Sequence, residues 1–326
     1  MKGFASAPGK VILFGEHFIL YGCPAISMAI NLYSNVIVKP RKDKILRIFS
    51  KNLNLERKFF ERKSKGHEAK EGEGHLEPVR IAAGEVLKLA SLDRGLNIEV
   101  DSQIPPAAGL GSSAAIAVST IASVAKLFEL KLTKDEIRGL AFPSERFVHG
   151  NPSGIDQTTS TFGGIICYEP KSGFRKIGAN AEFKIVIGDS GISRSTKEQI
   201  AKVKAYMDQH KDREEKILSE YKLMVSKAIN AIKTQDMSEL GYLMNENQRL
   251  LKEVGASSPI LDAIVERAIV GGALGAKLTG AGGGGCAIAL VTERTEEKVM
   301  KEVLKVSKRA YLVNVDWCGV RSKKLD

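Results

Sequence analysis

Cysteine is scarce in this sequence, and its four copies, Cys23, Cys167, Cys286 and Cys318, stand far apart without a CxxC pair. This spacing argues against a zinc site and against a dense disulfide framework. The chain also lacks the ~18 to 20 consecutive apolar residues that a membrane-spanning helix needs. Its first residues, MKGFASAPGKVILFGEH, contain no apolar core of a secretory signal. These absences predict a cytoplasmic protein without a membrane segment.

Acidic residues are outnumbered, and the 326 residues carry a formal net charge of +11. Eleven of the basic residues lie between positions 41 and 70, with Phe49, Phe59 and Phe60 among them. Such a stretch is compatible with a nucleic-acid surface, but the alternation in ILRIF favours an amphipathic hairpin with a solvated face. A basic field would also attract a polyphosphate substrate. We therefore expect no nucleic-acid partner.

The remaining composition, 43% hydrophobic and 27% charged, is that of a globular protein. At ~100 to 200 residues per domain, the length predicts two domains. We place them at 1–180 and 181–326, with an exposed connection over 170–181. Strands and helices mix in both halves, so we expect an α+β protein.

Apolar periodicity and turn residues give the expected elements. We expect strands within 10–38, a hairpin over 44–60, a helix over 78–89, a strand over 96–101, a buried helix over 112–128, a further helix opened by a Thr133–Glu136 capping box, short β runs over 151–168, a strand at FKIVIGDSG, helices over 195–232, 236–254 and 259–270, strands over 275–279 and 285–291, a helix over 295–308 and a last strand at YLVNVDW.

The strongest chemical signal is PPAAGLGSSAA at 105–115, a glycine and serine turn between a strand and a helix. Glycines let the backbone approach a polyphosphate, a helix N-terminus presents free N–H groups to it, and serine hydroxyls can reach phosphate-bound Mg²⁺. The spacing fits neither of the common nucleotide-binding fingerprints. The alternative interpretation is a tight turn that only precedes a core helix.

Two further segments bring acids and bases together. APGKVILFGEH at 7–17 places Lys10, Glu16 and His17 around an apolar strand, and ERFVHGNPSGID at 145–156 places two carboxylates on either side of a glycine-proline turn. One carboxylate can hold a metal while the other takes a proton, as phosphoryl transfer requires. For His149 we favour a structural role in the turn, hydrogen-bonded to backbone.

The fourth segment, KLTGAGGGGC at 277–286, ends a β run in glycines that allow another surface to come very close. It predicts a loop that closes over a binding site. A flexible hairpin connection is the competing interpretation.

In this order, the four segments resemble the motifs of the GHMP kinases, named after galactokinase, homoserine kinase, mevalonate kinase and phosphomevalonate kinase. The HGNPSGID and ISRST segments are most similar to those of the members that act on mevalonate. The resemblance implies an N-terminal lobe like ribosomal protein S5 domain 2 and a ferredoxin-like C-terminal lobe. ATP, Mg²⁺ and mevalonate would meet between the lobes, and a homodimer is compatible with it.

The resemblance also implies roles for individual residues. Asp156 would be the catalytic base, Lys10 would stabilise developing charge, and Ser113 and Glu145 would hold Mg²⁺. Glu16, His17, Ser153 and Thr196 would surround the acceptor. The nucleotide would contact Gln103, Ile104, Pro105, Pro106, Ala107, Ala108, Gly109, Leu110, Gly111, Ser112, Ser113, Gly280, Gly282 and Gly283.

The sequence departs from the family pattern at Ile116, where several members have tyrosine, and at Phe14, where histidine is common. Two alternative functions stay open. A sister kinase could act on phosphomevalonate, on another position of mevalonate or on a sugar, although a phosphorylated acceptor needs added basic residues and ISRST supplies only Arg194. The other alternative is a non-catalytic nucleic-acid-binding protein, which would not require Lys10, Glu145 and Asp156 together.

Overall fold

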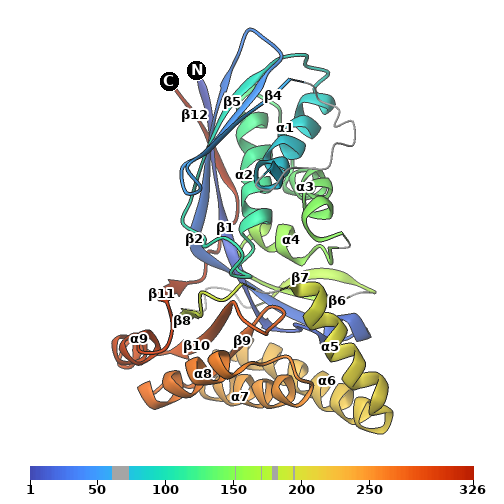
Figure 1. Cartoon of the computed structure of the whole chain (residues 1–326), viewed down its shortest axis with the longest axis vertical. Helices are drawn as coiled ribbons and strands as arrows, with labels where there is room; N and C mark the ends of the chain where they lie inside the picture. Colours follow the sequence, from blue (N-terminus) through green and yellow to red (C-terminus); the bar gives the residue numbers. More distant parts are fainter. Residues whose placement is uncertain (61–72, 151, 170, 178–182, 194) are drawn as a thin grey trace.

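The structure is a computed structural model that describes residues 1–60, 73–150, 152–169, 171–177, 183–193 and 195–326. Its elements form two sheets with helices packed on them (Figure 1). The first part of the chain holds β1 (Lys2–Phe14), η1 (Phe18–Tyr21), β2 (Ala25–Pro40), β3 (Leu46–Ser50), β4 (Leu55–Phe59), η2 (Glu73–Leu76), α1 (Glu77–Leu89), β5 (Leu96–Ser102), α2 (Ser112–Leu127), α3 (Lys134–His149), α4 (Ile155–Phe162), β6 (Ile165–Glu169) and β7 (Gly173–Ile177).

The rest of the chain builds mainly the second sheet and its helices. It holds β8 (Lys184–Asp189), α5 (Thr196–Gln209), α6 (Lys211–Thr234), α7 (Met237–Glu253), α8 (Pro259–Gly271), β9 (Gly275–Thr279), β10 (Cys286–Val291), α9 (Glu296–Leu304), β11 (Arg309–Asn314) and β12 (Arg321–Leu325).

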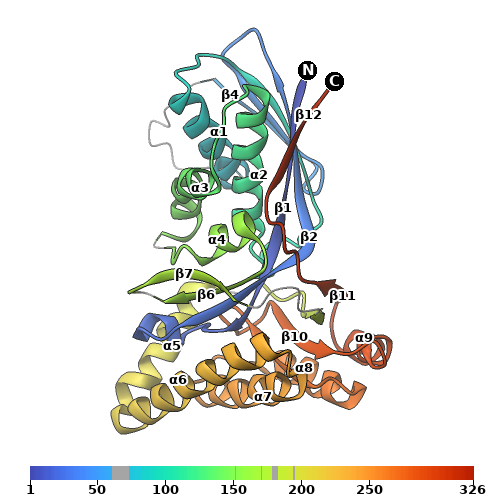
Figure 2. The same ribbon diagram turned by 180° about the vertical axis from the view of Figure 1, so that it is seen from behind.

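The first sheet has the order β12-β1-β2-β5-β3-β4, and β6 joins it by pairing with β2 and β7. Helices α1 to α4 lie together on one side of it (Figures 1 and 2). Helix α2 is rich in small residues and lies so close to β1 that a Cβ on Gly3 would be 2.1 Å from the Ser123 carbonyl oxygen. The Ser123 hydroxyl also donates to the Gly3 carbonyl at 2.9 Å. The helix expected to be buried is therefore the central support of β1.

The second sheet has four antiparallel strands in the order β11-β8-β10-β9. Helices α5 to α8 connect β8 to β9, and α9 connects β10 to β11. This is the β-α-β-β-α-β sequence of a ferredoxin-like lobe. Side chains of α7 cover the outer edge of β9, because Asn245 and Gln248 accept hydrogen bonds at 2.9 Å from the N–H groups of Ala276 and Leu278.

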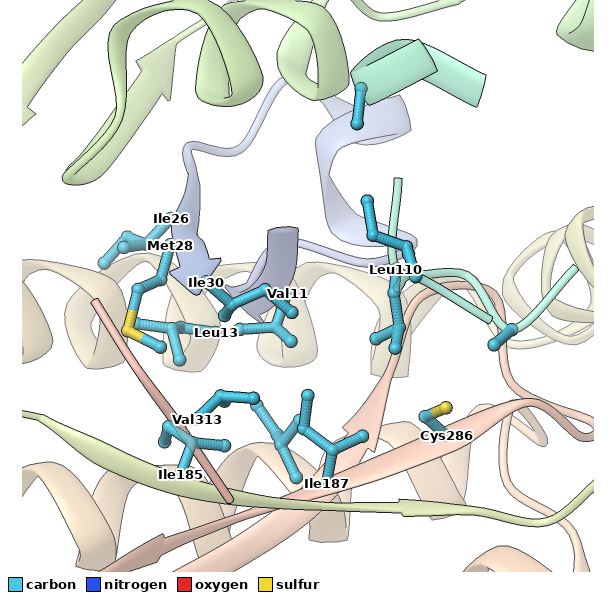
Figure 3. Packing of buried hydrophobic residues seen from close by; sticks show 14 of the residues in the cluster. Val11, Leu13, Ile26, Met28, Ile30, Leu110, Ile185, Ile187, Cys286 and Val313 are labelled. Atoms are coloured by element: carbon cyan, nitrogen blue, oxygen red, sulfur yellow. The ribbon is translucent and has the colours of Figure 1, made fainter. Parts of the chain in front are cut away.

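Apolar side chains join the two lobes. In Figure 3, side chains from the lower parts of β1 and β2 point toward the second sheet, whose own apolar side chains point back. All belong to one buried cluster, so the lobes share a core rather than meeting through a wet interface. The labelled residues are Val11, Leu13, Ile26, Met28, Ile30, Leu110, Ile185, Ile187, Cys286 and Val313.

The expected division at residue 180 falls in 178–182, outside the described residues. The chain does not divide simply in two, because β12 pairs with β1 from Lys2↔Leu325 to Ser6↔Arg321. The last strand therefore belongs to the first sheet. The expected exposed connection also contains β7, which pairs with β6.

Most expected elements are confirmed, including the 44–60 hairpin and the Thr133–Glu136 capping box. Two expectations were wrong. Residues 155–162 form helix α4 and no strand, because Gly154 and Gly163 cap a short helix where the sequence suggested turns. The long helix over 195–232 is interrupted at His210, whose φ of −127° and ψ of 58° are not helical.

Basic residues of the 41–60 segment are largely paired with acids. Arg47 contacts Glu56 at 2.6 Å and Lys51 contacts Glu99 at 2.7 Å. This pattern favours the solvated hairpin over a nucleic-acid surface for the described part of the segment. Among the described helices, none combines the length and apolar character needed to cross a membrane.

Candidate active site

Strand β1 carries Lys10, which contacts the glycine turn at residues 109–111. The Lys10 side chain is 6% exposed, and its Nζ lies 3.2 Å from Asp156 Oδ1 and 3.2 Å from the Gly109 carbonyl oxygen. Its backbone N–H also donates to the Leu110 carbonyl at 2.9 Å. These contacts join residues at least 99 positions apart. The ion pair between an enclosed lysine and a carboxylate is the centre of the site.

Gly111 makes room for this lysine. It has a φ of 73°, and a Cβ built there would lie 2.8 Å from Lys10 Cγ. Only glycine satisfies both the left-handed backbone and the close approach without strain. The turn thus folds over the lysine stem and leaves Nζ directed at Asp156.

The glycine turn presents backbone rather than side chains. Ile104, Ala108 and Leu110 are buried in the core, and α2 begins at Ser112 directly after the turn. The first N–H groups of a helix have no intrahelical acceptor and carry the positive end of its dipole, so this is a place for an anion. Within the expected nucleotide segment, the N–H groups at the start of α2 are therefore placed for a phosphate, whereas those of Gln103 and Ile104 donate within the protein.

Gln103 has a different position from the rest of the turn. Its side-chain oxygen accepts a hydrogen bond from the Tyr33 N–H at 3.0 Å, and its own N–H donates to the Tyr33 carbonyl at 2.8 Å. Gln103 therefore extends the β2–β5 pairing and anchors the base of the turn.

Helix α3 places Glu145 under the turn. Its side chain is 1% exposed, and its Oε1 has no hydrogen-bond partner within the described part of the chain. Burial raises the pKa of Glu145 to about 7, with the charge of Asp156 as the second cause. A hydrogen bond with Ser113 and the charge of Lys10 act in the opposite direction.

These residues fit a Mg²⁺ ion. A buried carboxylate with an unpartnered oxygen, facing a second carboxylate and next to the Ser113 hydroxyl, is stabilised by a cation. Mg²⁺ commonly takes one or two carboxylates and completes its shell with water and substrate phosphates. In the described ranges no group of three or more His, Cys, Asp or Glu side chains has metal-binding geometry, and a site of this type does not require one.

His149 also belongs to the site, although the sequence suggested a backbone-bonded turn histidine. Its Nε2 lies 3.4 Å from Ser113 Oγ and 3.8 Å from Glu145 Oε2. Burial is the main cause that lowers the pKa of His149. The spacing of four residues on one helix was a signal for its contact with Glu145, because positions i and i+4 share a helix face.

Helix α4 fixes Asp156 through buried hydroxyl groups. Ser160 Oγ donates to the Pro8 carbonyl at 2.7 Å, and Thr159 Oγ1 lies 2.6 Å from Ser27 Oγ. Both partners are on β1 or β2, so α4 is held on the strands that carry Lys10. Ser153 is exposed just before this helix and accepts a 3.4 Å hydrogen bond from the Ile155 N–H.

The second glycine loop, residues 280–285, is tightly packed. The Gly283 N–H donates to the Ala256 carbonyl at 2.9 Å, and a Cβ on Gly282 would be 1.9 Å from that same oxygen. A Cβ on Gly283 would lie 2.5 Å from the Gln199 amide. These contacts disfavour the flexible hairpin connection. Thr196, one turn before Gln199, is exposed at the start of α5.

The residues around the start of this loop reach β1 of the first lobe. His17 Nε2 lies 2.8 Å from the Ala281 carbonyl oxygen, and Glu16 forms an ion pair with Lys277 in which both side chains are 0% exposed. Sequence reasoning assigned no role to Lys277. Its position inside the apolar run GAKLT was the available signal, since lysine is seldom buried without a partner.

Comparison with known proteins agrees with this geometry. Residues 78–164 match the GHMP kinases N terminal domain, and residues 228–308 match the GHMP kinases C terminal domain. A mevalonate kinase of Thermococcus sibiricus is 39% identical over 310 residues, which are 91% of each chain. The chain belongs to the GHMP kinase family.

Solved structures of GHMP kinases share the whole fold. The mevalonate kinase of Methanococcus jannaschii superposes with a TM-score of 0.84 at 32% identity, over 96% of this chain and 98% of that one. The L. major mevalonate kinase, solved in complex with R-mevalonate, gives a TM-score of 0.83 at 28% identity over 95% of each chain. The expected two-lobed α+β fold of a GHMP kinase is thereby confirmed.

Proposed function

We propose that the protein is a mevalonate kinase that transfers the γ-phosphoryl group of ATP to the C5 hydroxyl of mevalonate. The products are 5-phosphomevalonate and ADP, which places the reaction in isoprenoid synthesis by the mevalonate pathway. One observation carries the proposal. The Lys10–Asp156 pair, at 3.2 Å, lies at the entrance of a glycine turn that opens a helix. Proton acceptor, cation and anion site therefore meet at one point, as phosphoryl transfer requires.

Asp156 is positioned to accept the proton of the attacking hydroxyl. It is the more exposed member of the pair, with 27% of its side chain accessible. Its place at the start of α4 is fixed by the buried hydroxyl bonds of that helix. A general base needs a defined position within hydrogen-bond reach of the proton that it takes.

Lys10 acts on charge. Its Nζ is held by the Gly109 carbonyl and Asp156, so it stabilises negative charge on the acceptor oxygen or on the transferring phosphoryl group without prior rearrangement. Within residues 103–113, the main chain at the start of α2 binds the phosphates of ATP, and Gly280, Gly282 and Gly283 border them from the second lobe. Mg²⁺, held by Ser113 and Glu145, would neutralise phosphate charge.

On the acceptor side, we propose that His17, Ser153 and Thr196 are the contacts of mevalonate. Their support is the family resemblance and the position of Ser153 two residues before the helix that carries Asp156. Arg194, which the sequence offered as a basic residue on this side, lies outside the described residues. A cytoplasmic location and a homodimer stay predictions, as does the absence of nucleic-acid and membrane partners.

The test is ADP formation by the purified protein with ATP and Mg²⁺, in parallel reactions with mevalonate, phosphomevalonate, galactose and homoserine. We expect kcat/KM for mevalonate to exceed the others by orders of magnitude. Activity confined to another acceptor would retain the kinase fold and mechanism and reject mevalonate as the substrate. Salt-dependent nucleic-acid binding without phosphoryl transfer would reject both.

A further inference from the structure

Three side-chain contacts, made by six residues, connect the end of β1 and the turn after it with β9 and the second glycine loop. The contacts pair Ile12 with Thr279, Glu16 with Lys277 and His17 with Ala281.

The first contact fixes backbone to side chain in both directions. Thr279 Oγ1 accepts from the Ile12 N–H at 2.9 Å and donates to the Ile12 carbonyl at 3.1 Å. The hydrogen bonds of the Ile12 N–H and of the Ile12 carbonyl are both buried. One hydroxyl therefore sets the distance and the register between β1 and β9. The contact is made at Ile12, two residues after Lys10 in the chain.

The second contact is energetically unusual. Glu16 and Lys277 are both fully buried, and Lys277 Nζ also donates to the Leu278 carbonyl at 2.8 Å. Burial raises the pKa of Glu16 and lowers that of Lys277, while each partner opposes the effect on the other. Neutral residues of similar volume often replace such a pair without loss of stability. Stability alone therefore does not explain why two charges are placed here.

Position in the chain suggests what the pair does. Glu16 follows Lys10 by six residues on the same strand and turn, and Lys277 precedes Gly280 by three. The loop after Gly280 is fixed in turn by the Ala256 carbonyl. The ion pair is thus a buried link between the strand that carries Lys10 and the loop expected to border the phosphates, beside the contacts of Ile12 and His17.

We propose that Lys277 and Glu16 are positioning residues that hold the second glycine loop in register with Lys10, so that the phosphoryl group and the acceptor hydroxyl are aligned. This inference rests on the proposed kinase function. It assigns to Glu16 a role different from the acceptor contact that the family resemblance implied, because its carboxylate is closed off from solvent. The pair acts through the loop and touches no reactant.

The test uses Lys277→Met, Glu16→Gln and the double variant Glu16→Gln/Lys277→Met. Lys277→Met leaves a buried charge without its partner, and we expect its Tm to fall by roughly 5 to 15 °C. The double variant removes both charges and should recover most of that loss. Its kcat should nevertheless stay on the order of 10 to 100 times below that of the unmodified protein, because a shift of ~1 Å in an aligned site has such a cost. The KM values for acceptor and ATP should change by less than about threefold, since no contact with a reactant is lost.

A readout independent of turnover is hydrogen exchange of the amides at 277–285. We expect these amides to exchange faster in the double variant than in the unmodified protein. The exchange rates of the amides in β1 should stay unchanged. Lys305→Met is the matched control, because Lys305 pairs with Glu302 on the surface, where the side chain is 57% exposed. It should change neither kcat nor exchange in the loop.

Two results would overturn the proposal. Recovery of kcat together with Tm in the double variant would show that the two charges only neutralise each other and do not position the loop. A rise of more than about tenfold in acceptor KM at unchanged kcat, in Glu16→Gln, would make Glu16 an acceptor contact. If the unmodified protein prefers another acceptor, the proposed substrate fails, and the same kcat comparison is then made with that acceptor.

Discussion

The two glycine-rich segments of this protein use glycine for different purposes. In the turn at 103–113, Gly111 leaves space for the side chain of Lys10, which a Cβ at this position would meet. In the loop at 280–285, Gly282 leaves space for a carbonyl oxygen of the scaffold, that of Ala256. A flexible side chain can move aside, whereas backbone cannot. The comparison shows that the first segment is shaped around the side chain of Lys10, whereas the second is shaped around the backbone of its own lobe.

The largest effect on activity is expected beside the first segment. Asp156→Asn removes the proposed proton acceptor and leaves the hydroxyl hydrogen bonds of α4 in place, so kcat should fall by ~10²- to 10⁴-fold. Coupled measurement of ADP formation gives the change. A melting curve close to that of the unmodified protein is the accompanying control. Near-normal turnover in this variant would exclude Asp156 as the base.

The largest effect on stability is expected in the second segment. Gly282→Ala places a Cβ within 1.9 Å of the Ala256 carbonyl at a φ of 78°, and it should lower the free energy of unfolding by about 3 kcal/mol or more. Chemical denaturation measures it. Gly173→Ala is a matched control, because Gly173 has a φ of 81° and no atom within 4 Å of the added Cβ. Equal losses in the two variants would mean that backbone strain, and not the close approach, is responsible.

Gly111→Ala sharpens the same contrast from the other side. The added Cβ would meet the Lys10 stem, which can shift, so stability should fall by only about 1 kcal/mol, as for Gly173→Ala. The displaced Nζ should lower kcat on the order of tenfold to a hundredfold. Steady-state kinetics and denaturation of the same preparation test both parts. A large loss of stability with intact kcat would reverse the roles of the two segments.

The smallest expected effect concerns pH. The pKa of Glu145 in the folded protein is about 7, above its ordinary value of 4.5, so the folded state binds this proton more tightly than the unfolded chain. The stabilising contribution of the protonated carboxyl is complete below pH ~4.5 and is lost as pH rises through 7.

Glu145→Gln imitates the protonated form at every pH. Without Mg²⁺ and nucleotide, its free energy of unfolding should match that of the unmodified protein near pH 4.5 and exceed it by about 2 kcal/mol at pH 8. Urea denaturation over this range provides the comparison. If the difference in free energy of unfolding between the two proteins does not change with pH, protonation of Glu145 is not its cause.

Local pattern was sufficient for much of the fold. Apolar spacing predicted α2 and the strands of the second sheet, and the Thr133–Glu136 capping box predicted the start of α3. Local pattern failed to predict elements whose structure depends on contacts with distant parts of the chain. Strand β12, RSKKL, has no apolar alternation and is a strand because β1 offers it an unpaired edge. Helix α4 is short and flanked by glycines, which the sequence alone presents as turns.

The same division holds for the site. Resemblance to a family selected Lys10 and Asp156, and the structure brings them together. No periodicity could have paired residues so far apart in the chain. The sequence offered weak signals for His149 and Lys277, namely the i,i+4 spacing from Glu145 and a lysine inside an apolar run. Both signals gain significance only when the surroundings of the side chain are known, which for Lys277 is its burial against Glu16.

The pairing of β12 with β1 has a consequence for how the fold can form. Along the chain, β12 follows every strand of the second sheet, yet its backbone hydrogen bonds are made to β1 of the first sheet (Figure 1). A pairing between residues so far apart in the sequence closes a long loop and cannot arise from local contacts. The first sheet is therefore complete only when the chain has passed through the second lobe and returned.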